Sequence, residues 1–280
     1  MKADRRQIST ARGVALVRAI EMTRPEADRA SSDPYAHRFV NPLTVQFMRV
    51  VGALGINRLT GIDGLMNFAM AREQHIAAVM VRELRAGAEQ IVVLGAGFDT
   101  RCYRLPEAAA VPVFEVDHPV TQAAKREALR GVVEPLPAHV RFVGVDFDHD
   151  DLGERLRAAG YDEGKRTLFV WQGVIVYLTR DGADRTLAFI AGHSASGSVV
   201  VFDSIDSAAL TGSGATGLRV FTSAMGENVT FGIGLDEIVP WLAARGFGDV
   251  DIFGHAAMQR AYLGRRPIAA GVYIATARVA

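Results

Sequence analysis

The segment IVVLGAGFDTRCYRL (Ile91–Leu105) joins an apolar stretch directly to two closely spaced glycines. A buried strand followed by such a turn is typical of the first strand of a doubly wound α/β sheet, where Gly95 would let the backbone approach a ligand closely. The place of the third glycine of a dinucleotide-binding turn is taken by Thr100, and Pro106 leaves room for only a short helix. A pyrophosphate site is therefore disfavoured, and a tight turn without a ligand stays open.

Short β-branched runs alternate with amphipathic helical segments from Glu89 onward. The runs are at residues 90–95, 111–117, 140–146, 167–172, 198–203, 249–255 and 271–279. Helical segments between most of them predict an open α/β sheet, seven-stranded, Rossmann-like and mostly parallel. The segment between the last two runs does not look like a crossover helix, so we expect an antiparallel edge strand there.

The first part of the chain has helical periodicity and no clear strand. We therefore expect an N-terminal helical cap over residues 1–86 and a sheet-forming core over residues 87–280. The segment at about 204–233 mixes Ser, Gly and Thr with apolar residues, which suggests a lid over an acceptor site; an ordinary crossover helix is the alternative.

Composition narrows the classes of partner. Basic and acidic residues both number 31, which argues against nucleic acid and anionic membranes. The single cysteine, Cys102, excludes an internal disulfide and fits a reducing, cytoplasmic setting. Arg12 and Arg18 interrupt any apolar run near the N-terminus, so we expect neither a leader nor a membrane span there. The seven histidines form no HxxxH or HxH pair, so no metal site is expected.

Carboxylates follow the second and third predicted strands. Asp117 ends FEVDHP about 20 residues after the glycine turn, the spacing at which an acid accepts hydrogen bonds from ribose hydroxyls. Its alternative role is a helix N-cap. Asp146 could bind an adenine amine with Phe147 beside the ring; the alternative is a solvated cap in an acidic loop. Together with the glycine turn, these residues indicate a nucleoside ligand.

The motifs VVLGAGFDTRCYRL, FEVDHP, VDF and WQGVIVYLT resemble those of the leucine carboxyl methyltransferase family, which belongs to the class I S-adenosylmethionine-dependent methyltransferases. The resemblance is strongest to a bacterial branch that includes polyketide carboxyl O-methyltransferases. It implies a seven-stranded sheet with a helical cap and S-adenosyl-L-methionine above the first strand. It also implies that Arg72 pairs with the methionine carboxylate, Gly95 lies beside the methionine moiety, Asp117 binds ribose, and Asp146 and Phe147 contact adenine.

One position departs from the family pattern. Gln172 stands where the family usually has Glu, whose carboxylate would pair with the cofactor ammonium. Glutamine keeps an acceptor oxygen but loses the charge.

Two aromatic side chains complete the candidate site. Tyr177 follows the fourth predicted strand, where its face could hold the sulfonium by a cation–π attraction of roughly 1 kcal/mol; a core tyrosine is the alternative. His255 ends the sixth predicted strand and is the candidate base, although a surface role is the simpler interpretation.

The sequence predicts methyl transfer to the oxygen of a small-molecule carboxylic acid, in a secondary-metabolic setting. Three alternatives stay open at this point: methylation of a phenol or other hydroxyl, a cofactor-binding enzyme that performs cyclisation or rearrangement without methyl transfer, and a nicotinamide-dependent reductase. The missing third glycine weakens the last of them.

Overall fold

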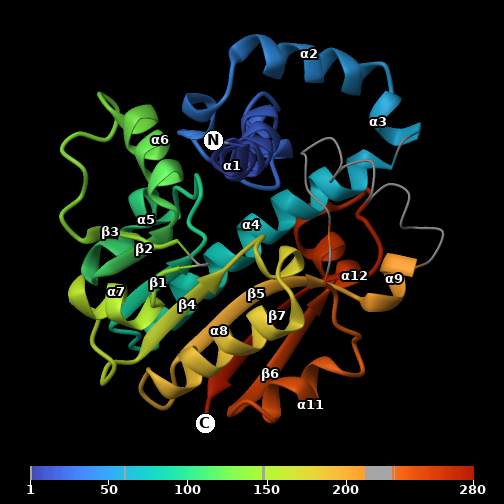
Figure 1. The fold of residues 1–280 in the computed structure, drawn as a ribbon. Coiled ribbons are helices and arrows are strands. Elements are labelled where there is room, and N and C mark those ends of the chain that lie inside the picture. Colours follow the sequence, from blue (N-terminus) through green and yellow to red (C-terminus); the bar gives the residue numbers. More distant parts are fainter. Residues whose placement is uncertain (1, 60, 147–148, 212–228, 230) are drawn as a thin grey trace.

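Seven strands form one mixed sheet in the computed structural model, in the order β3-β2-β1-β4-β5-β7-β6 (Figure 1). The structure describes residues 2–59, 61–146, 149–211, 229 and 231–280. The strands are β1 (Gln90–Leu94), β2 (Val113–Asp117), β3 (Val140–Gly144), β4 (Thr167–Trp171), β5 (Val199–Ile205), β6 (Phe247–Gly254) and β7 (Val272–Val279). Each of the seven runs expected from the sequence is a strand of this sheet.

Strands β1 to β5 pair in parallel, and β7 pairs antiparallel with both β5 and β6. The predicted mostly parallel sheet with an antiparallel pairing at one edge is thus confirmed. The edge strand is β6, and the strand reversed relative to the others is its inner neighbour β7. The connection between β6 and β7 stays at one end of the sheet, which an antiparallel pair allows and a parallel pair does not.

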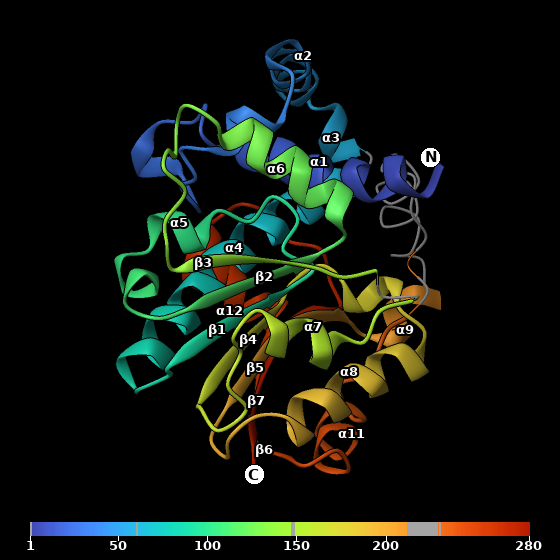
Figure 2. The same cartoon turned by 60° about the vertical axis from the view of Figure 1, so that its left-hand side comes forward.

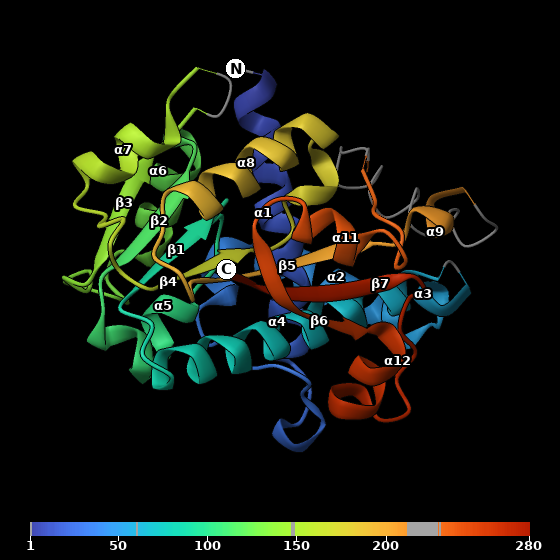
Figure 3. The same cartoon turned by 90° about the horizontal axis from the view of Figure 1, so that it is seen from below.

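Helices cover both faces of the sheet (Figure 3). They are α1 (Lys2–Glu21), α2 (Pro42–Ala53), α3 (Ile56–Leu59), α4 (Ile62–Arg85), α5 (Arg101–Arg104), α6 (Pro119–Leu129), α7 (Leu152–Ala158), α8 (Arg180–Gly192), α9 (Ser207–Thr211), α11 (Ile238–Ala243) and α12 (His255–Met258), with short 3₁₀ turns that include η4 (Ile175–Tyr177). Helices α4 and α12 lie on one face, and α7, α8 and α11 lie on the other. Central strands covered on both sides are buried along their whole length, which explains their largely apolar sequence.

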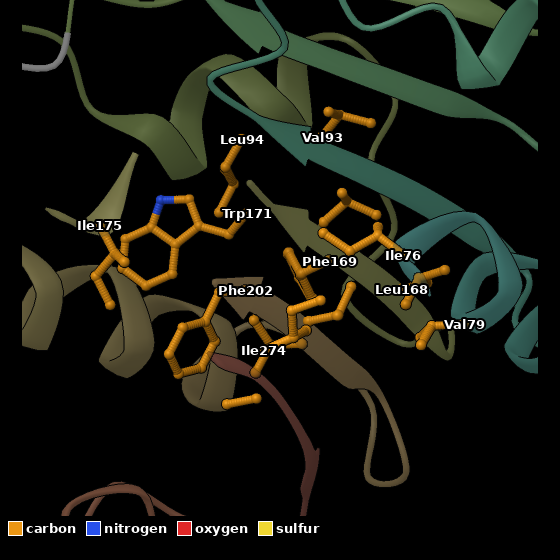
Figure 4. Close-up of a cluster of buried hydrophobic side chains, with 14 of the residues drawn as sticks. Ile76, Val79, Val93, Leu94, Leu168, Phe169, Trp171, Ile175, Phe202 and Ile274 are labelled. Atoms are coloured by element: carbon orange, nitrogen blue, oxygen red, sulfur yellow. The ribbon is translucent and has the colours of Figure 1, made fainter. Parts of the chain in front are cut away.

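The core occupies both faces of the central sheet, and helix α4 packs on one of them (Figure 4). Its side chains come from α4, β1, β4, η4, β5 and β7: Ile76, Val79, Val93, Leu94, Leu168, Phe169, Trp171, Ile175, Phe202 and Ile274. Successive strand residues point to opposite faces of the sheet. By its packing, α4 therefore belongs to the helical layer of the sheet. Helix α4 contacts β4 and β5 on one side and α1 and α3 on the other.

Helices α1, α2 and α3 come before α4 in the chain. In space, α1 lies between the sheet and α2 (Figures 1 and 2). Helix α2 begins at Pro42, where the Asn41 side chain accepts a hydrogen bond from the Leu43 amide. Most of the predicted lid at about 204–233 lies outside the described residues. None of the described helices combines the length and apolar character that crossing a membrane requires.

Candidate functional site

A cavity of about 300 Å³ lies where β1, β2 and β4 end. Its wall includes Gly95, Asp117 and Gln172, one from the end of each of these strands, and helix α1 contributes Thr10 and Val14. The strand order reverses between β1 and β4: the chain adds β2 and β3 on one side of β1, and β4 and β5 on the other side. Ligands of doubly wound sheets bind at this switch point, beyond the carboxyl ends of the strands.

The turn after β1 requires its glycines. Gly95 has φ +66°, and a Cβ atom there would overlap a methyl group of Val174. Gly97 has φ +46° and lies against Ala11 of α1, so a larger residue would press on that helix. The turn therefore brings bare backbone to the cavity and packs it closely under α1.

Asp117 holds this turn in place. Its Oδ2 accepts a hydrogen bond from the Gly97 amide at 2.5 Å, and its Oδ1 accepts one from the His118 amide at 2.7 Å. Burial raises the pKa of Asp117, and the two backbone hydrogen bonds oppose that rise. The N-cap of α6 is His118, whose Nδ1 accepts from the Val120 amide. Asp117 is thus not the cap, and its oxygens keep lone pairs for a ligand in the cavity.

Arg72 is buried on α4 and lines the same cavity. Its Nη1 lies 2.5 Å from Asp203 Oδ2 on β5, and Asp203 Oδ1 accepts from the Gly173 amide at 2.6 Å. The Nε of Arg72 is buried and makes no hydrogen bond within the described chain. A ligand carboxylate would therefore find an unused donor on a cation that is already positioned.

Glu73 follows Arg72 on α4 and is 2% exposed. Its Oε1 accepts from Arg104 Nη2, and Arg101 Nε lies 3.8 Å from the same oxygen. Burial alone would raise the pKa of Glu73, but the neighbouring guanidinium groups hold that pKa below its usual value. The sequence analysis did not identify this residue, because charged residues on a helix usually face solvent.

Asp99 and Arg101 explain the FDTR part of the turn. Asp99 accepts from the backbone amide of Arg101 and from its Nε and Nη2 atoms. Burial acts to raise the pKa of Asp99, but the Arg101 charge lowers it far below its usual value. Arg101 is fully buried and connects Asp99 to Glu73. The residues around the position of the third glycine therefore form buried ion pairs beside the cavity. A dinucleotide-binding protein would have its phosphate site there.

Gln172 and Tyr177 lie on the segment after β4. Gln172 Nε2 donates to Glu73 Oε2 at 3.5 Å, while Gln172 Oε1 is buried and has no partner within the described residues. Tyr177 ends η4 and lines the cavity together with Gln172. The structure thus brings five of the candidate residues together around one cavity: Arg72, Gly95, Asp117, Gln172 and Tyr177.

Two candidate residues of the described chain, Asp146 and His255, are not among those that line this cavity. Asp146 follows β3, where its side chain is 43% exposed and its amide donates to Asp150. Phe147 lies outside the described residues. His255 begins α12 after the edge strand β6 and lines neither of the two cavities formed around the strand ends by described residues, so the structure does not bring it to the site.

A second cavity of about 70 Å³ adjoins the first. The two share Thr10, Val14, Arg72, Gly173 and Tyr177. Most of the smaller wall is apolar, with Leu65, Phe68, Val176, Ile205, Val229 and Val272 among its side chains. Within the described residues, no group of three or more His, Cys, Asp or Glu side chains could hold a metal ion.

The chain is similar to known proteins in sequence and in fold. The model of the leucine carboxyl methyltransferase family matches residues 11–191. A Bacillus subtilis protein, named provisionally as an S-adenosyl-L-methionine-dependent methyltransferase, is 38% identical over 146 residues, which cover 52% of this chain and 48% of that protein. A Mycolicibacterium paratuberculosis protein with a name of the same kind is 32% identical over 207 residues, which cover 70% and 65%. The chain thus spans about half of the first relative and just under two thirds of the second.

A solved structure shares the fold. Magnesium protoporphyrin IX methyltransferase from Synechocystis PCC 6803, solved with bound SAH, has a TM-score of 0.50 at 12% identity, with 83% of this chain and 97% of that chain covered. At such low sequence identity, the similarity supports a shared fold and nothing about a shared reaction. The family model, in contrast, matches more than half of the chain and includes the glycine turn, Asp117 and Gln172. The chain therefore belongs to the leucine carboxyl methyltransferase family.

Proposed function

We propose that this chain binds S-adenosyl-L-methionine and transfers its methyl group to the oxygen of a small-molecule carboxylic acid. The observation that carries the proposal is the convergence, in one cavity at the switch point, of the Gly95 turn, Asp117, Arg72 and the unpartnered oxygen of Gln172. Each of these groups suits a different part of this cofactor. The names of the relatives agree with that assignment.

The residues present fit the cofactor. Asp117 offers acceptor oxygens to a ribose diol, and Gly95 brings bare backbone close to the ligand. Arg72 keeps an unused Nε donor for a carboxylate. Gln172 Oε1 is a buried acceptor with no partner in the described chain, and such an atom costs roughly 1–3 kcal/mol until a donor reaches it. An ammonium group is such a donor.

The chemistry asked of the chain is alignment and exclusion of water. When bound, S-adenosyl-L-methionine supplies a methyl group that its sulfonium already activates. Helix α1 contributes Thr10, Ala11 and Val14 to the cavity wall, where they would exclude water from one side of a bound ligand. Tyr177 and Arg72 line both cavities and therefore lie where a cofactor and an acceptor would meet.

The smaller cavity supports an acid as the acceptor. Its wall is mostly apolar, and Arg72 is the cation within it. A carboxylate is ionised at neutral pH and needs no base. Among the described residues, no histidine, lysine or cysteine lines this cavity. The proposed reaction therefore does not depend on proton removal by the enzyme.

A hydroxyl acceptor is the second candidate, because Asp203 and Tyr177 also line the smaller cavity. Asp203 is already bound by Arg72 and by the Gly173 amide, one at each of its oxygens. A hydroxyl acceptor would have to share an oxygen that one of these donors already engages. The acid acceptor is favoured for this reason.

The test uses cofactor labelled in its methyl group and a panel of carboxylic acids, each matched with a phenol of the same skeleton. Transfer to the acids, with the label released by mild alkali, is expected because esters hydrolyse under conditions that leave ethers intact. Alkali-stable label would instead identify a hydroxyl acceptor. Calorimetry with S-adenosylhomocysteine and NADH checks the cofactor independently: only the former is expected to bind. Binding without transfer to any acceptor would favour a cofactor-binding enzyme of another reaction.

A further inference from the structure

The ammonium of the cofactor needs a negative partner, and position 172 carries none. We propose that Glu73 supplies this carboxylate, with the side-chain oxygen of Gln172 as the second acceptor. The charge that binds the ammonium then comes from helix α4 and not from the segment after β4. This inference rests on the proposed function, since it concerns how the same cofactor is held.

The contacts of Glu73 leave one oxygen available. Oε1 is bound by Arg104 and lies 3.8 Å from Arg101 Nε. Oε2 accepts one hydrogen bond, from Gln172 Nε2, at the long distance of 3.5 Å. Both Glu73 and Gln172 line the larger cavity. The oxygen not engaged by arginine is therefore on the side of Glu73 that faces Gln172.

The carboxylate also fixes the orientation of the Gln172 amide. The NH₂ end turns toward Glu73, because a carboxylate accepts hydrogen bonds and cannot donate them. The Oε1 end is thereby left buried and without a partner in the described chain. An ammonium carries three donors and no acceptor. It can donate to Glu73 Oε2 and to Gln172 Oε1 together, which satisfies the unpaired atom.

Charge balance explains why residue 172 is neutral here. The arginines around Glu73 hold its pKa below the usual value, so it is ionised at neutral pH. A second carboxylate at position 172 would stand about as far from Glu73 as the present 3.5 Å contact. Two acids this close do not both ionise readily. A single charge on α4 with a neutral amide opposite avoids that conflict.

The first test measures binding to the purified chain by calorimetry. The ligands are S-adenosylhomocysteine, which carries the ammonium, and 5′-methylthioadenosine, which lacks the amino acid end. Glu73→Gln is expected to raise the Kd for S-adenosylhomocysteine about tenfold or more, and to leave that for 5′-methylthioadenosine within about twofold. Glu83→Gln is the matched control, because Glu83 is another buried, ion-paired acid on α4 that lines neither cavity at the strand ends; it should change neither Kd.

The double variant Glu73→Gln with Gln172→Glu moves the charge across the 3.5 Å contact. Its affinity for S-adenosylhomocysteine should return to within about threefold of wild type. An equal loss for both ligands in Glu73→Gln, or no loss for either, would overturn the inference. Failure of the wild-type chain to bind S-adenosylhomocysteine at all would instead overturn the proposed function.

If Glu73→Gln does not fold, the single variant Gln172→Glu tests whether Glu73 binds the ammonium. With Glu73 adjacent, the new carboxyl should hold a proton at neutral pH and release it when the ammonium binds. The binding enthalpy of this variant should then change with the ionisation heat of the buffer, whereas that of the wild type should not. Tighter binding of about tenfold, with no buffer dependence, would mean that Glu73 does not face the ammonium.

Discussion

Arg72 and Asp203 are 131 residues apart in the chain, and their side chains meet at 2.5 Å beside both cavities. The pair joins α4 to β5, and Gly173 connects it to the segment after β4 through the second oxygen of Asp203. Arg72 is therefore held before any ligand arrives. Its Nε is buried and makes no hydrogen bond in the described structure, so this donor is available to a ligand.

Arg72→Lys should weaken S-adenosylhomocysteine binding about tenfold, because lysine keeps the charge but loses the planar fork that can serve Asp203 and a ligand carboxylate together. Isothermal titration provides the measurement. Arg82→Lys, at a half-exposed position on the same helix, is the control and should bind like wild type. Unchanged affinity in Arg72→Lys would remove this arginine from the cofactor site.

Asp117→Ala should reduce the free energy of S-adenosylhomocysteine binding by about 2–3 kcal/mol, because hydrogen bonds from ribose hydroxyls to a charged group are lost. Asp181→Ala, at an exposed position in the first turn of α8, should have no such effect. The comparison needs a folded variant, since Asp117 also holds the Gly97 amide. Circular dichroism of both variants checks this, and full affinity in folded Asp117→Ala would contradict the ribose assignment.

Gly95→Ala should lower the free energy of unfolding more than Gly131→Ala does. Both glycines have positive φ, +66° and +74°, so both substitutions carry a backbone cost of roughly 1 kcal/mol. The space around Gly131 is open, whereas a Cβ at Gly95 would overlap Val174. Denaturant unfolding of the two variants isolates this overlap, and a Val174→Ala background should recover part of the loss. Equal losses would show that the turn moves to make room.

Stability should fall in acid through the Asp99–Arg101 pair. The pKa of Asp99 in the folded chain is lowered from the usual 3.8. As the pH falls, Asp99 is therefore protonated in the unfolded chain while it is still ionised in the folded chain. The contribution of the pair is therefore complete above about pH 5 and is lost as the pH falls through 4 and below. Asp99→Asn should cost about 3 kcal/mol at pH 7, and the difference from wild type should shrink between pH 5 and pH 3. A constant difference across that range would mean that Asp99 does not titrate with folding.

Methyl transfer to an acid should not depend on histidine. His118 is the histidine that lines the larger cavity among the described residues, and His118→Asn preserves a helix-capping side chain. His118→Asn and His255→Ala should each keep the single-turnover rate within about tenfold of wild type, whereas loss of a general base typically costs 10²–10⁴-fold. A loss of that size with ligand binding intact would point to a hydroxyl acceptor.

Most of the fold was predictable because the sheet is buried on both faces. Strands such as β1 and β4 must be continuously apolar, and that pattern is visible in the sequence. The role of α4 was not predictable in this way. Its helical period looks the same whether its apolar side packs against a cap or against the sheet, and only the long-range contacts of Ile76 and Met80 distinguish the two.

The candidate site was predictable where a motif fixes the backbone. Gly95 and Asp117 stand at strand ends, so their meeting follows from the parallel register of β1 and β2. The pairing of Glu73 with Arg104 and Gln172 could not be foreseen, because it joins α4 to two separate loops and depends on how far the helix has turned. Charged residues on a helix usually face solvent, and nothing local marks Glu73 as buried.

Helix α1 forms part of the cavity wall and is anchored by Arg18, which donates to the Phe98 carbonyl and pairs with Asp33. A ligand that touches this wall binds the closed arrangement better than one with α1 detached. By mass action, every such ligand slows the exchange of the α1 amide hydrogens with deuterium, and at saturating ligand the factor equals the ratio of its affinities for the two arrangements. Amide exchange along residues 9–21 thus reports occupancy of the cavity without any knowledge of the acceptor.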